Sequence, residues 1–581
     1  MVGGASVSIE ELGSQEGYLT RIRNLPVTKL PEVARDIRNT IMSIVPICGG
    51  HYASPLGVVE LSIALHYVFC SPVDKIVWDT GHQAYAHKLL TGRIGGFEKL
   101  RTPDGPSGFP TITESEHDAF GTGHCSTAIA AAIGLSRSAQ VKVDDAFCVA
   151  VIGDGALAGG PALEGLALVK DLGTRVVVVL NDNGYAISPT RGALAQQRER
   201  SYRQLAHSMG LRFVGPLNGH DILALVQAFQ QIKLWGDSVF LQVTTTKGTG
   251  DVQAEADPVR RYAIPRQARA DSSPGESMQH AVTRALHGIM QEVDSLCVIT
   301  PGMSEGAGLA TLAKRYPSRV LDVGIAEASA VTLGAALAVG GGRVMVHLYS
   351  TFLQRAADQL VHDVGLQHLP LVVLVDRVGF SGDDGPTHHG IYDLPYLRVV
   401  PGIAVWSLSE AGQVLQAVAL AVRKSTGPVA IRISKGASVC WDNEGRTMPL
   451  TAVSVRRTGL DLTVLTHGRI SEQVLRACQR VEEHGIRCQV VEVARLWPLD
   501  VPALQVSILP DCPLAVVEET IEAASLGEAI GVLSGDLRCG RMLHLPIRNG
   551  NVPAGPVGFQ QAQAGIDEHS LAKAFVELAS S

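Results

Sequence analysis

Several features that mark secreted, membrane or nucleic-acid-binding proteins are missing from this sequence. Its ten cysteines form no CxxC pair and no Cys/His spacing typical of a metal site, so we expect reduced thiols. No apolar run is long enough to span a membrane, and the N-terminal MVGGASVSIEELGS has acids where a secretory signal would be basic and then apolar. The net charge of −7, without a dense Lys/Arg tract, argues against nucleic acid as a partner. We therefore expect a cytoplasmic protein that acts on small molecules.

The composition is that of an ordinary multidomain globular protein. Hydrophobic residues make up 46% and charged residues 18% of the 581 positions, and this length suits about three or four domains. From residue 30 to about residue 265, helical stretches alternate with short β-branched runs, as in a parallel sheet with crossover helices. Residues 31–46 and 57–69 in this part have the pattern of amphipathic helices.

A polar stretch at residues 254–276 predicts a linker. Beyond it, the runs SLCVIT, RVLDVG, RVMVHLYS and LPLVVLVDR predict the strands of a second α/β unit. The runs DLTVLTHG, RCQVVEVARLWPLD and PLAVVEET predict those of a third. The sequence therefore predicts an α/β fold of three domains with mainly parallel sheets, at residues 1–265, 277–443 and 451–581.

Two polar turns follow two of the predicted strands. GDGA at 153–156 follows one apolar run, and NDN at 181–183 follows the next. Neighbouring parallel strands present their carboxyl ends at the same edge, so Asp154 and Asn183 should lie side by side. Their hard oxygen ligands suit Mg²⁺, which usually shares its coordination with phosphates, and the glycines let backbone N–H groups approach a phosphate. The pair predicts a metal–diphosphate site, whereas either turn alone would be only a turn.

Further motifs occur in one order along nearly the whole chain. They are GGHYASPLG, DTGHQAYAHK, FGTGHCSTA, GIAEASA, YSTFLQRAADQ, DRVGFSGDDGPTHHG and RLWPLD. With GDG and NDN, which resemble the metal–diphosphate motif of thiamine diphosphate enzymes, they resemble the 1-deoxy-D-xylulose 5-phosphate synthase family, a relative of transketolase. The resemblance implies a diphosphate-binding, a pyrimidine-binding and a C-terminal transketolase-like domain, in that order. It also implies thiamine diphosphate held between the first two domains, Mg²⁺ and a homodimer.

The resemblance also implies roles for particular residues. Mg²⁺ would be bound by Asp154, Asn183 and the backbone carbonyl of Tyr185. Glu327 matches the carboxylate that hydrogen-bonds the aminopyrimidine of the cofactor, and Phe352 would stack on that ring. The other residues expected around the diphosphate and thiazolium are His82, Gly123, His124, Cys125, Gly155, Ala156, Asn183 and Ile187.

Four histidines fall in Gly-rich or polar loops that match one active site. Because imidazole titrates near neutral pH, we expect His51, His82 and His388 to transfer protons with Glu327 as the fourth catalytic residue. His124 is better suited to a cofactor contact, and His389 to a structural role. For a phosphorylated substrate the chain offers Ser54, Tyr349, Arg355, Arg377, Asp384, His388 and Lys435. Lys435 stands where the family has a second phosphate-binding Arg, and Lys lacks the planar fork of Arg.

The chain departs from the family pattern at several positions. Asp251 replaces an aromatic residue after KGTG, and Tyr262 stands where a catalytic His is expected. Ala328 and Ser329 replace Gln-His after the glutamate. The segment after Ile187 is shorter than the family's mobile loop, which should alter how water and substrate are gated.

The leading hypothesis is a carboligase that decarboxylates pyruvate and transfers the two-carbon unit to D-glyceraldehyde 3-phosphate, for isoprene and thiamine biosynthesis. A paralogue that uses another aldehyde acceptor or a ketose donor is the alternative. A non-catalytic regulatory homologue is a third reading, disfavoured because Asp154, Asn183 and Glu327 would then have no evident use.

Overall fold

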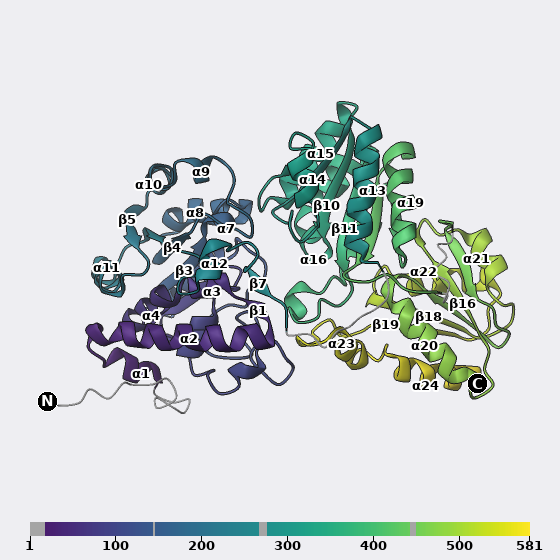
Figure 1. Ribbon diagram of the computed structural model, residues 1–581, viewed down its shortest axis with the longest axis horizontal. Coiled ribbons are helices and arrows are strands. Elements are labelled where there is room, and N and C mark those ends of the chain that lie inside the picture. The colour runs from purple at the N-terminus through teal and green to yellow at the C-terminus, as the bar shows by residue number, and fades with distance from the viewer. Residues whose placement is uncertain (1–17, 143–145, 267–275, 442–448, 581) are drawn as a thin grey trace. The chain divides into compact units, whose positions relative to one another are not determined.

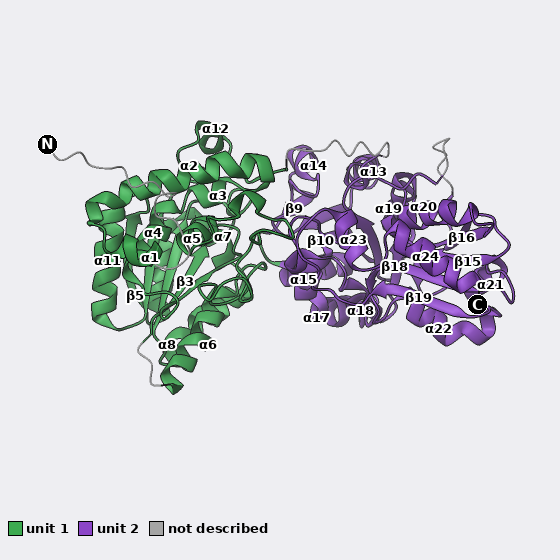
Figure 2. Ribbon diagram, turned by 90° about the horizontal axis from the view of Figure 1, so that it is seen from below, with its two compact units in different colours: residues 1–270, 324–326 green, residues 271–323, 327–581 purple. Residues whose placement is uncertain are grey.

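The computed structural model describes residues 18–142, 146–266, 276–441 and 449–580 (Figure 1). The N-terminal segment that was compared with a secretory signal lies outside the described residues, as do residues 267–275 of the predicted linker. Contacts divide the chain into two compact units (Figure 2). Unit 1 is Met1–Ala270 with Gly324–Ala326, and unit 2 is Asp271–Val323 with Glu327–Ser581.

Unit 1 contains a five-stranded parallel sheet in the order β2-β3-β4-β6-β5. The strands are β2 (Lys75–Trp78), β3 (Cys148–Gly153), β4 (Val176–Asp182), β5 (Arg212–Asn218) and β6 (Val239–Thr244). The two strands at its centre, β3 and β4, are apolar and almost wholly buried, as expected where helices cover both faces of a parallel sheet.

Successive side chains of these strands point to opposite faces and enter two different cores. Val149 and Val151 pack with α1 (Tyr18–Arg23), α2 (Leu30–Cys48), α4 (Val59–Val68), α5 (Tyr85–Leu90) and α11 (Ile222–Trp235). Ala150 and Ile152 pack with α6 (Ala128–Val141), α8 (Gly160–Asp171) and α10 (Arg198–Ser208). Shorter helical turns connect these elements: η1 (Val27–Lys29), α3 (Ala53–Leu56), η2 (Phe97–Lys99), α7 (Asp154–Leu157), α9 (Ala193–Gln196) and α12 (Val252–Ala256).

The predicted helices at 31–46 and 57–69 are both present, but the second is not amphipathic. Every residue from Val59 to His66 in α4 is buried, because α1, α2, α5 and α11 pack around it. A helix enclosed on all sides needs no polar face. The interpretation of 57–69 as an amphipathic helix was therefore wrong.

Part of the predicted linker is ordered structure of unit 1. β1 (Gly50–His51) pairs antiparallel with β7 (Ala263–Ile264). Residues 263–264, near the end of the predicted linker's described part, therefore lie beside the segment that carries His51. Asp251 caps α12 by accepting hydrogen bonds from the N–H groups of Gln253 and Ala254. This position, which departs from the family pattern, is a helix N-cap here.

Unit 2 contains two sheets. The larger has seven strands in the order β17-β12-β13-β11-β10-β8-β9, parallel except for β17. Its strands are β8 (Leu296–Thr300), β9 (Val320–Asp322), β10 (Arg343–Tyr349), β11 (Leu371–Val378), β12 (Ala404–Ser407), β13 (Val429–Ser434) and β17 (Arg495–Trp497). The helical elements around it are α13 (Met278–Glu292), α14 (Ala310–Arg315), α15 (Glu327–Val339), α16 (Ser350–Leu353), η3 (Gln354–Ala356), α17 (Ala357–Gln359), η4 (Leu360–Gly365), η5 (Pro386–His388), α18 (Asp393–Arg398) and α19 (Ala411–Lys424).

The second sheet of unit 2 has five strands in the order β14-β16-β15-β18-β19, parallel except for β14. They are β14 (Val453–Arg457), β15 (Leu462–Thr466), β16 (Cys488–Val493), β18 (Leu514–Ile521) and β19 (Met542–Ile547). The helical elements are η6 (Gly468–Ile470), α20 (Ser471–Glu482), α21 (Val501–Ser507), α22 (Leu526–Leu537), α23 (Val557–Gln563) and α24 (Glu568–Ala579). One apolar cluster joins the two sheets, since it contains Val373 and Val375 of β11 as well as Val491 of β16 and Val516 of β18.

The predicted fold class, α/β with mainly parallel sheets, is confirmed. Among the described residues, no helix combines the length and the apolar character needed to cross a membrane.

A buried ion pair in unit 2 gives a stability prediction. Arg432 Nε and Nη2 lie 2.6 and 3.0 Å from the carboxylate oxygens of Asp393, and both side chains are fully buried. Replacing Asp393→Ala leaves the guanidinium without its counter-charge and should lower the free energy of unfolding by roughly 3–5 kcal/mol. Denaturant unfolding of the full chain measures this change. The control Arg423→Met removes a surface pair with Glu292 and should change the free energy by no more than about 1 kcal/mol. Equal effects of the two variants would contradict the prediction.

Candidate functional site

The pairing of β3 with β4 brings two polar strand ends together, as the sequence predicts. Gly153 is the register partner of Asn181, so Asp154 and Asn183 follow neighbouring parallel strands at the same edge of the sheet. Gly155 lies against Ala186, since a Cβ at Gly155 would come within 2.6 Å of the Ala186 Cβ. The two turns therefore approach each other too closely for a larger residue at 155.

Asp154 is a buried carboxylate with one oxygen held and one oxygen open to a ligand. Its Oδ2 accepts hydrogen bonds from the Gly184 N–H at 3.1 Å and from Thr190 Oγ1 at 2.8 Å. Its Oδ1 is buried and has no hydrogen-bond partner among the described residues. Burial raises the pKa of Asp154 to about 6. A buried carboxylate oxygen without a donor is suited to a cation.

The next turn orders the other expected metal ligands. Asn183 Oδ1 accepts the N–H of Tyr185 at 3.0 Å, which bends the chain back toward Asp154 as an Asx turn. Asp154, Asn183 and the main chain at Tyr185 thus belong to one compact feature. The described residues hold no cluster of three or more His, Cys, Asp or Glu side chains that could bind a metal by themselves. One carboxylate with amide and carbonyl oxygens fits Mg²⁺ that keeps ligands from a phosphate group.

Lys247 is a site residue that the sequence reasoning did not select. It is 3% exposed, and its Nζ donates to the Ala186 carbonyl at 2.7 Å. The ammonium also lies over the rings of Tyr262 and Tyr185, 4.8 and 5.7 Å from their centroids. Burial lowers the pKa of Lys247 to about 8. A buried ammonium beside the Asp154 turn adds positive charge where an anionic ligand would bind.

The turn that precedes Lys247 is held by a chain of polar contacts. His220 Nδ1 lies 3.2 Å from the Glu60 carboxylate, and His220 Nε2 accepts the N–H of Thr246 at 2.9 Å. Arg38 pairs with the other oxygen of Glu60 at 2.6 Å. This chain of polar contacts fixes the backbone just before Lys247. No spacing in the sequence could reveal it, because the residues that carry it lie far apart along the chain.

His51, His82 and Tyr262 form an aromatic cluster in unit 1. The His51 ring centroid lies 5.6 Å from that of His82 and 5.3 Å from that of Tyr262, and Phe109 adds a contact at 5.4 Å. Burial, together with the charge of Lys247, lowers the pKa of His82 to about 3. The imidazole of His82 is therefore neutral at pH 7. Its Nδ1 is buried and has no hydrogen-bond partner among the described residues.

The Gly-rich segment at 121–126 is anchored to the end of β2. Asp79 accepts the N–H groups of Ser126 at 2.7 Å and Ala128 at 3.0 Å, which satisfies donors at the start of α6. Ser126 Oγ donates to the Ala156 carbonyl at 2.7 Å. This bond joins the segment Gly123–Cys125 to the GDGA turn. The structure thus brings His124 and Cys125 into the same part of unit 1 as Ala156.

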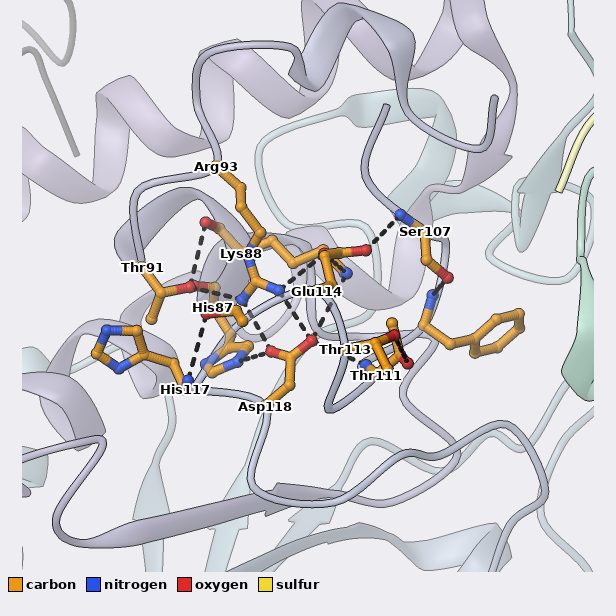
Figure 3. A network of polar contacts seen from close by, with 12 residues as sticks. His87, Lys88, Thr91, Arg93, Ser107, Thr111, Thr113, Glu114, His117 and Asp118 are labelled. Carbon is orange, nitrogen blue, oxygen red and sulfur yellow. Dashed lines mark hydrogen bonds and ion pairs between the residues drawn. The ribbon is translucent and has the colours of Figure 1, made fainter. Parts of the chain in front are cut away.

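A buried network of charged groups supports the loop that leads to Gly123 (Figure 3). Lys88 is fully buried and pairs with Glu114. Arg93 bridges Glu114 and Asp118, at 2.8 Å from each, and His87 Nε2 lies 2.9 Å from Asp118. Because an unpaired buried charge is strongly destabilising, each of these groups depends on the others.

The same carboxylates also hold the main chain of this loop. Glu114 accepts the N–H of Ser107 at 2.7 Å, and Asp118 accepts the N–H of Thr111 at 2.8 Å. Phe109, between these two points, is 2% exposed and packs on His51. The network therefore links the core of unit 1 to the histidine cluster.

In unit 2, Glu327 begins α15 and is 6% exposed. Burial raises the pKa of its carboxyl group, against the effect of Arg355, whose Nη1 lies 3.9 Å away. A glutamate of this kind holds a proton more readily than an exposed one. It is suited to share that proton with a ring nitrogen.

The remaining substrate candidates of unit 2 surround Tyr349. The Arg377 guanidinium lies 5.0 Å from the Tyr349 ring centroid, and its Nη2 donates to Tyr349 Oη at 3.2 Å. Phe352 stacks parallel to Tyr349 with centroids 6.0 Å apart, and His388 meets the Phe352 ring edge-on at 5.8 Å. Asp384 and His388 lie on the same loop after β11. Lys435 is exposed and directly follows β13.

The positions that depart from the family pattern are also visible. Ala328 is half-buried and Ser329 exposed in the first turn of α15. The segment after Ile187 forms α9 and α10, and Arg198 of α10 lies 3.6 Å from the Asp182 carboxylate. The shortened segment thus supplies a positive charge next to the metal-type turn.

The donor set of unit 1 fits a divalent cation with a diphosphate. Buried polar atoms without hydrogen-bond partners among the described residues include Asp154 Oδ1, His82 Nδ1, Ser54 Oγ and Thr122 Oγ1. The ammonium of Lys247 and the glycines at 123 and 155 are found in the same unit. Buried polar atoms of this kind usually have a partner, which a bound ligand, ion or water can supply.

Comparisons with known proteins agree with this geometry. Residues 275–438 match the family model described as the pyrimidine-binding domain of transketolase, and residues 451–570 match that of the transketolase C-terminal domain. These matches define a transketolase-like enzyme. Residues 16–206 match the family model described as 1-deoxy-D-xylulose-5-phosphate synthase.

Relatives extend the match to nearly the whole chain. The 1-deoxy-D-xylulose-5-phosphate synthase of Carboxydothermus hydrogenoformans is 36% identical over 96% of this chain and 98% of its own length. That of Thermomicrobium roseum is 37% identical over 96% of both chains. The chain belongs to the 1-deoxy-D-xylulose-5-phosphate synthase family, whose members are thiamine-diphosphate-dependent transferases. Among solved structures, a transketolase from Campylobacter jejuni aligns with 95% of this chain and 100% of its own, at 15% identity and a TM-score of 0.46.

The Asp154 geometry gives a binding prediction. Asp154→Asn keeps the size of the side chain but removes the charge, so Mg²⁺-dependent binding of thiamine diphosphate should weaken by at least about a hundredfold. The near-UV circular dichroism of the protein, titrated with cofactor at fixed Mg²⁺, measures this. Asp237→Asn, an exposed carboxylate of the same unit, serves as the control and should bind as the parent does. Unchanged affinity in Asp154→Asn would remove Asp154 from the metal site.

Proposed function

We propose that this protein is a 1-deoxy-D-xylulose-5-phosphate synthase. It would decarboxylate pyruvate and transfer the two-carbon unit to D-glyceraldehyde 3-phosphate, giving 1-deoxy-D-xylulose 5-phosphate and CO₂ for isoprene and thiamine biosynthesis. The observation that carries the proposal is the buried, unpartnered Oδ1 of Asp154 at the paired ends of β3 and β4. A carboxylate in that position has a use in a protein that binds a metal–diphosphate group.

The residues of unit 1 would bind and orient the cofactor. Asp154, Asn183 and the Tyr185 carbonyl would hold Mg²⁺, and the N–H groups of the GDGA turn and of Gly123–Cys125 would face the diphosphate. Ala156 and Ile187 would pack near the thiazolium, which acts as an electron sink when the cofactor is bound. Lys247 would place an ammonium beside the anionic groups.

Glu327 would hold a proton at an aminopyrimidine nitrogen. Its raised pKa suits this role, because a carboxyl group shares a proton best with a base of similar affinity. Phe352 offers an aromatic face to the same ring. Arg355, close to Glu327, would limit how far the carboxyl pKa rises.

The histidines divide by their surroundings. Because His82 is neutral at pH 7, it would act there as a hydrogen-bonding group toward a carbonyl or its hydroxyl form rather than as a cationic acid. His51 would transfer protons beside it, and His124 would contact the cofactor. In unit 2, the substrate would be served by His388 together with Tyr349, Arg355, Arg377, Asp384 and Lys435. In unit 1, Ser54 would serve it.

A divergent member with another aldehyde acceptor or a ketose donor is the second candidate. The observation that favours it is Tyr262, whose ring packs against both His51 and His82 at the position where the family has a catalytic histidine. A phenol cannot replace an imidazole as a proton carrier near pH 7. The exchange therefore bears on substrate choice and proton transfer rather than on cofactor binding.

We further propose the assembly and organisation that the family implies. The protein would be a cytoplasmic homodimer that uses small-molecule substrates. Residues 1–265 would be the diphosphate-binding domain, 277–443 the pyrimidine-binding domain and 451–581 the C-terminal domain.

A product assay over several aldehydes decides between the two candidates. The protein, loaded with thiamine diphosphate and Mg²⁺, is given pyruvate alone and then pyruvate with D-glyceraldehyde 3-phosphate or with other aldehydes. We expect 1-deoxy-D-xylulose 5-phosphate only with the phosphorylated triose. Pyruvate consumption without this product would favour the divergent member with another acceptor. Turnover of a ketose phosphate donor in place of pyruvate would favour the ketose-donor form, and turnover of neither donor would contradict both candidates.

Glu327→Gln should remove turnover while leaving the fold intact. The amide cannot take up and return a proton, so we expect kcat to fall by about 10²–10⁴-fold. Product formation and cofactor circular dichroism are measured on the same preparation. Glu483→Gln, at an exposed position that follows α20 in the same unit, serves as control. A kcat near that of the parent would refute the role of Glu327.

A further inference from the structure

The loop that carries Asp384 and His388 is held from the second sheet of unit 2. We call residues 379–390, which follow β11, the substrate loop. Its two ends pair with each other, since Gly379 and Gly390 exchange N–H···O bonds of 2.8 Å in both directions. These bonds join the two ends of the loop. Further hydrogen bonds connect the loop to the second sheet of unit 2 and its helices.

The first of these contacts is made by an ion pair to the main chain of Phe380. Glu519 Oε1 accepts the N–H of Phe380 at 3.1 Å, and Arg469 Nη2 donates to the Phe380 carbonyl at 2.7 Å. Arg469 is itself bidentate on Glu519, at 2.7 and 2.6 Å. The fork-to-fork pair thus satisfies both main-chain groups of one residue, as a neighbouring strand would.

Gly379 shows how closely this pair approaches the loop. A Cβ at Gly379 would come within 2.7 Å of Glu519 Oε2, and the residue has a φ of +90°. Both facts demand glycine at the start of the loop.

The second contact is made by the side-chain amide of Gln560 to the main chain of Gly382. Gln560 Oε1 accepts the N–H of Gly382 at 3.0 Å, and its Nε2 donates to the Gly382 carbonyl at 2.8 Å. Gln560 is fully buried, and its second Nε2 hydrogen reaches the Pro553 carbonyl at 3.0 Å. Again both main-chain groups of one loop residue are satisfied by one side chain.

The third contact is made by His389, a residue of the loop itself. Its Nε2 lies 2.9 Å from the Val552 carbonyl, and its Nδ1 accepts the N–H of Ser381 at 3.2 Å. Burial lowers the pKa of His389 to about 4, so the ring is neutral, with its proton on Nε2 toward Val552. This residue, expected from the sequence to be structural, joins the substrate loop to the segment before α23.

We infer that the second sheet of unit 2 and its helices serve to fix the substrate loop, with Arg469, Glu519 and Gln560 as positioning residues for Asp384 and His388. The inference rests on the proposed function for the roles of those two side chains. The hydrogen bonds from the three positioning residues to the loop go to main-chain groups of Phe380 and Gly382, so these residues act on the substrate through the geometry of the loop. A displacement of about 1 Å at such groups can reduce turnover by as much as a hundredfold.

A charge-balanced double variant tests this. Arg469→Met with Glu519→Met removes both hydrogen bonds to the main chain of Phe380 without leaving a buried charge. Arg457→Met with Glu482→Met is the control, because it removes an Arg–Glu pair, joined at 2.6 Å between β14 and α20, that is more exposed and lies away from the loop. Gln560→Met removes the hydrogen bonds to Gly382 and tests this contact by itself.

Two measurements separate this inference from the proposed function. Hydrogen exchange of the cofactor-loaded protein should be at least tenfold faster in residues 379–390 in both test variants than in the control. With D-glyceraldehyde 3-phosphate as the probe, KM should rise by roughly tenfold or more while cofactor binding is unchanged.

Unchanged exchange in the loop would overturn the inference, as would faster exchange with parental KM and kcat. If the parent protein makes no 1-deoxy-D-xylulose 5-phosphate, the proposed function fails, and exchange alone then decides whether the sheet fixes the loop.

Discussion

Several segments of this protein are held in place by pairs of opposite charges in its interior. Arg432 with Asp393, Lys88 with Glu114, and Arg469 with Glu519 are each enclosed and each matched by an opposite charge. A charge left alone in the interior would cost several kcal/mol, so these pairs fix the segments on which they sit. Asp154 is the contrast, because one of its oxygens is buried without a partner. This is the carboxylate that we propose binds a metal ion.

The parts of the site that follow from strand order could be predicted from the sequence. Apolar runs ending in GDGA and NDN required only that two parallel strands be neighbours, and the register of β3 with β4 confirms it. The roles of Asp154, Asn183, Glu327 and the histidines remain predictions, since they depend on a ligand. The resemblance to the 1-deoxy-D-xylulose 5-phosphate synthase family was found from motifs in loops, and the comparisons confirm it.

Other features could not be predicted because they depend on contacts between distant segments. Lys247 enters the site only because His220 and Glu60, far away in sequence, fix the turn before it. The helix at Val59–Val68 lost its expected polar face because four helices enclose it. Asp251, a departure from the family pattern, caps α12 and accepts a hydrogen bond from Tyr52 Oη at 2.7 Å. Periodicity and spacing describe neighbours along the chain, and these arrangements involve neighbours in space.

The hydrogen bonds that hold the loop after β11 are made to its peptide groups. Ion pair, amide and imidazole each bind an N–H or a carbonyl, which every residue other than proline provides in the same form. Apart from His389, which is itself one of the supports, and the glycines that close contacts require, the side chains of this loop can therefore change while its main-chain contacts remain. The conformation of the loop and the identity of its other side chains can therefore evolve independently. Selection could alter which aldehyde is accepted by a few exchanges on this loop while the fold beneath it stays the same.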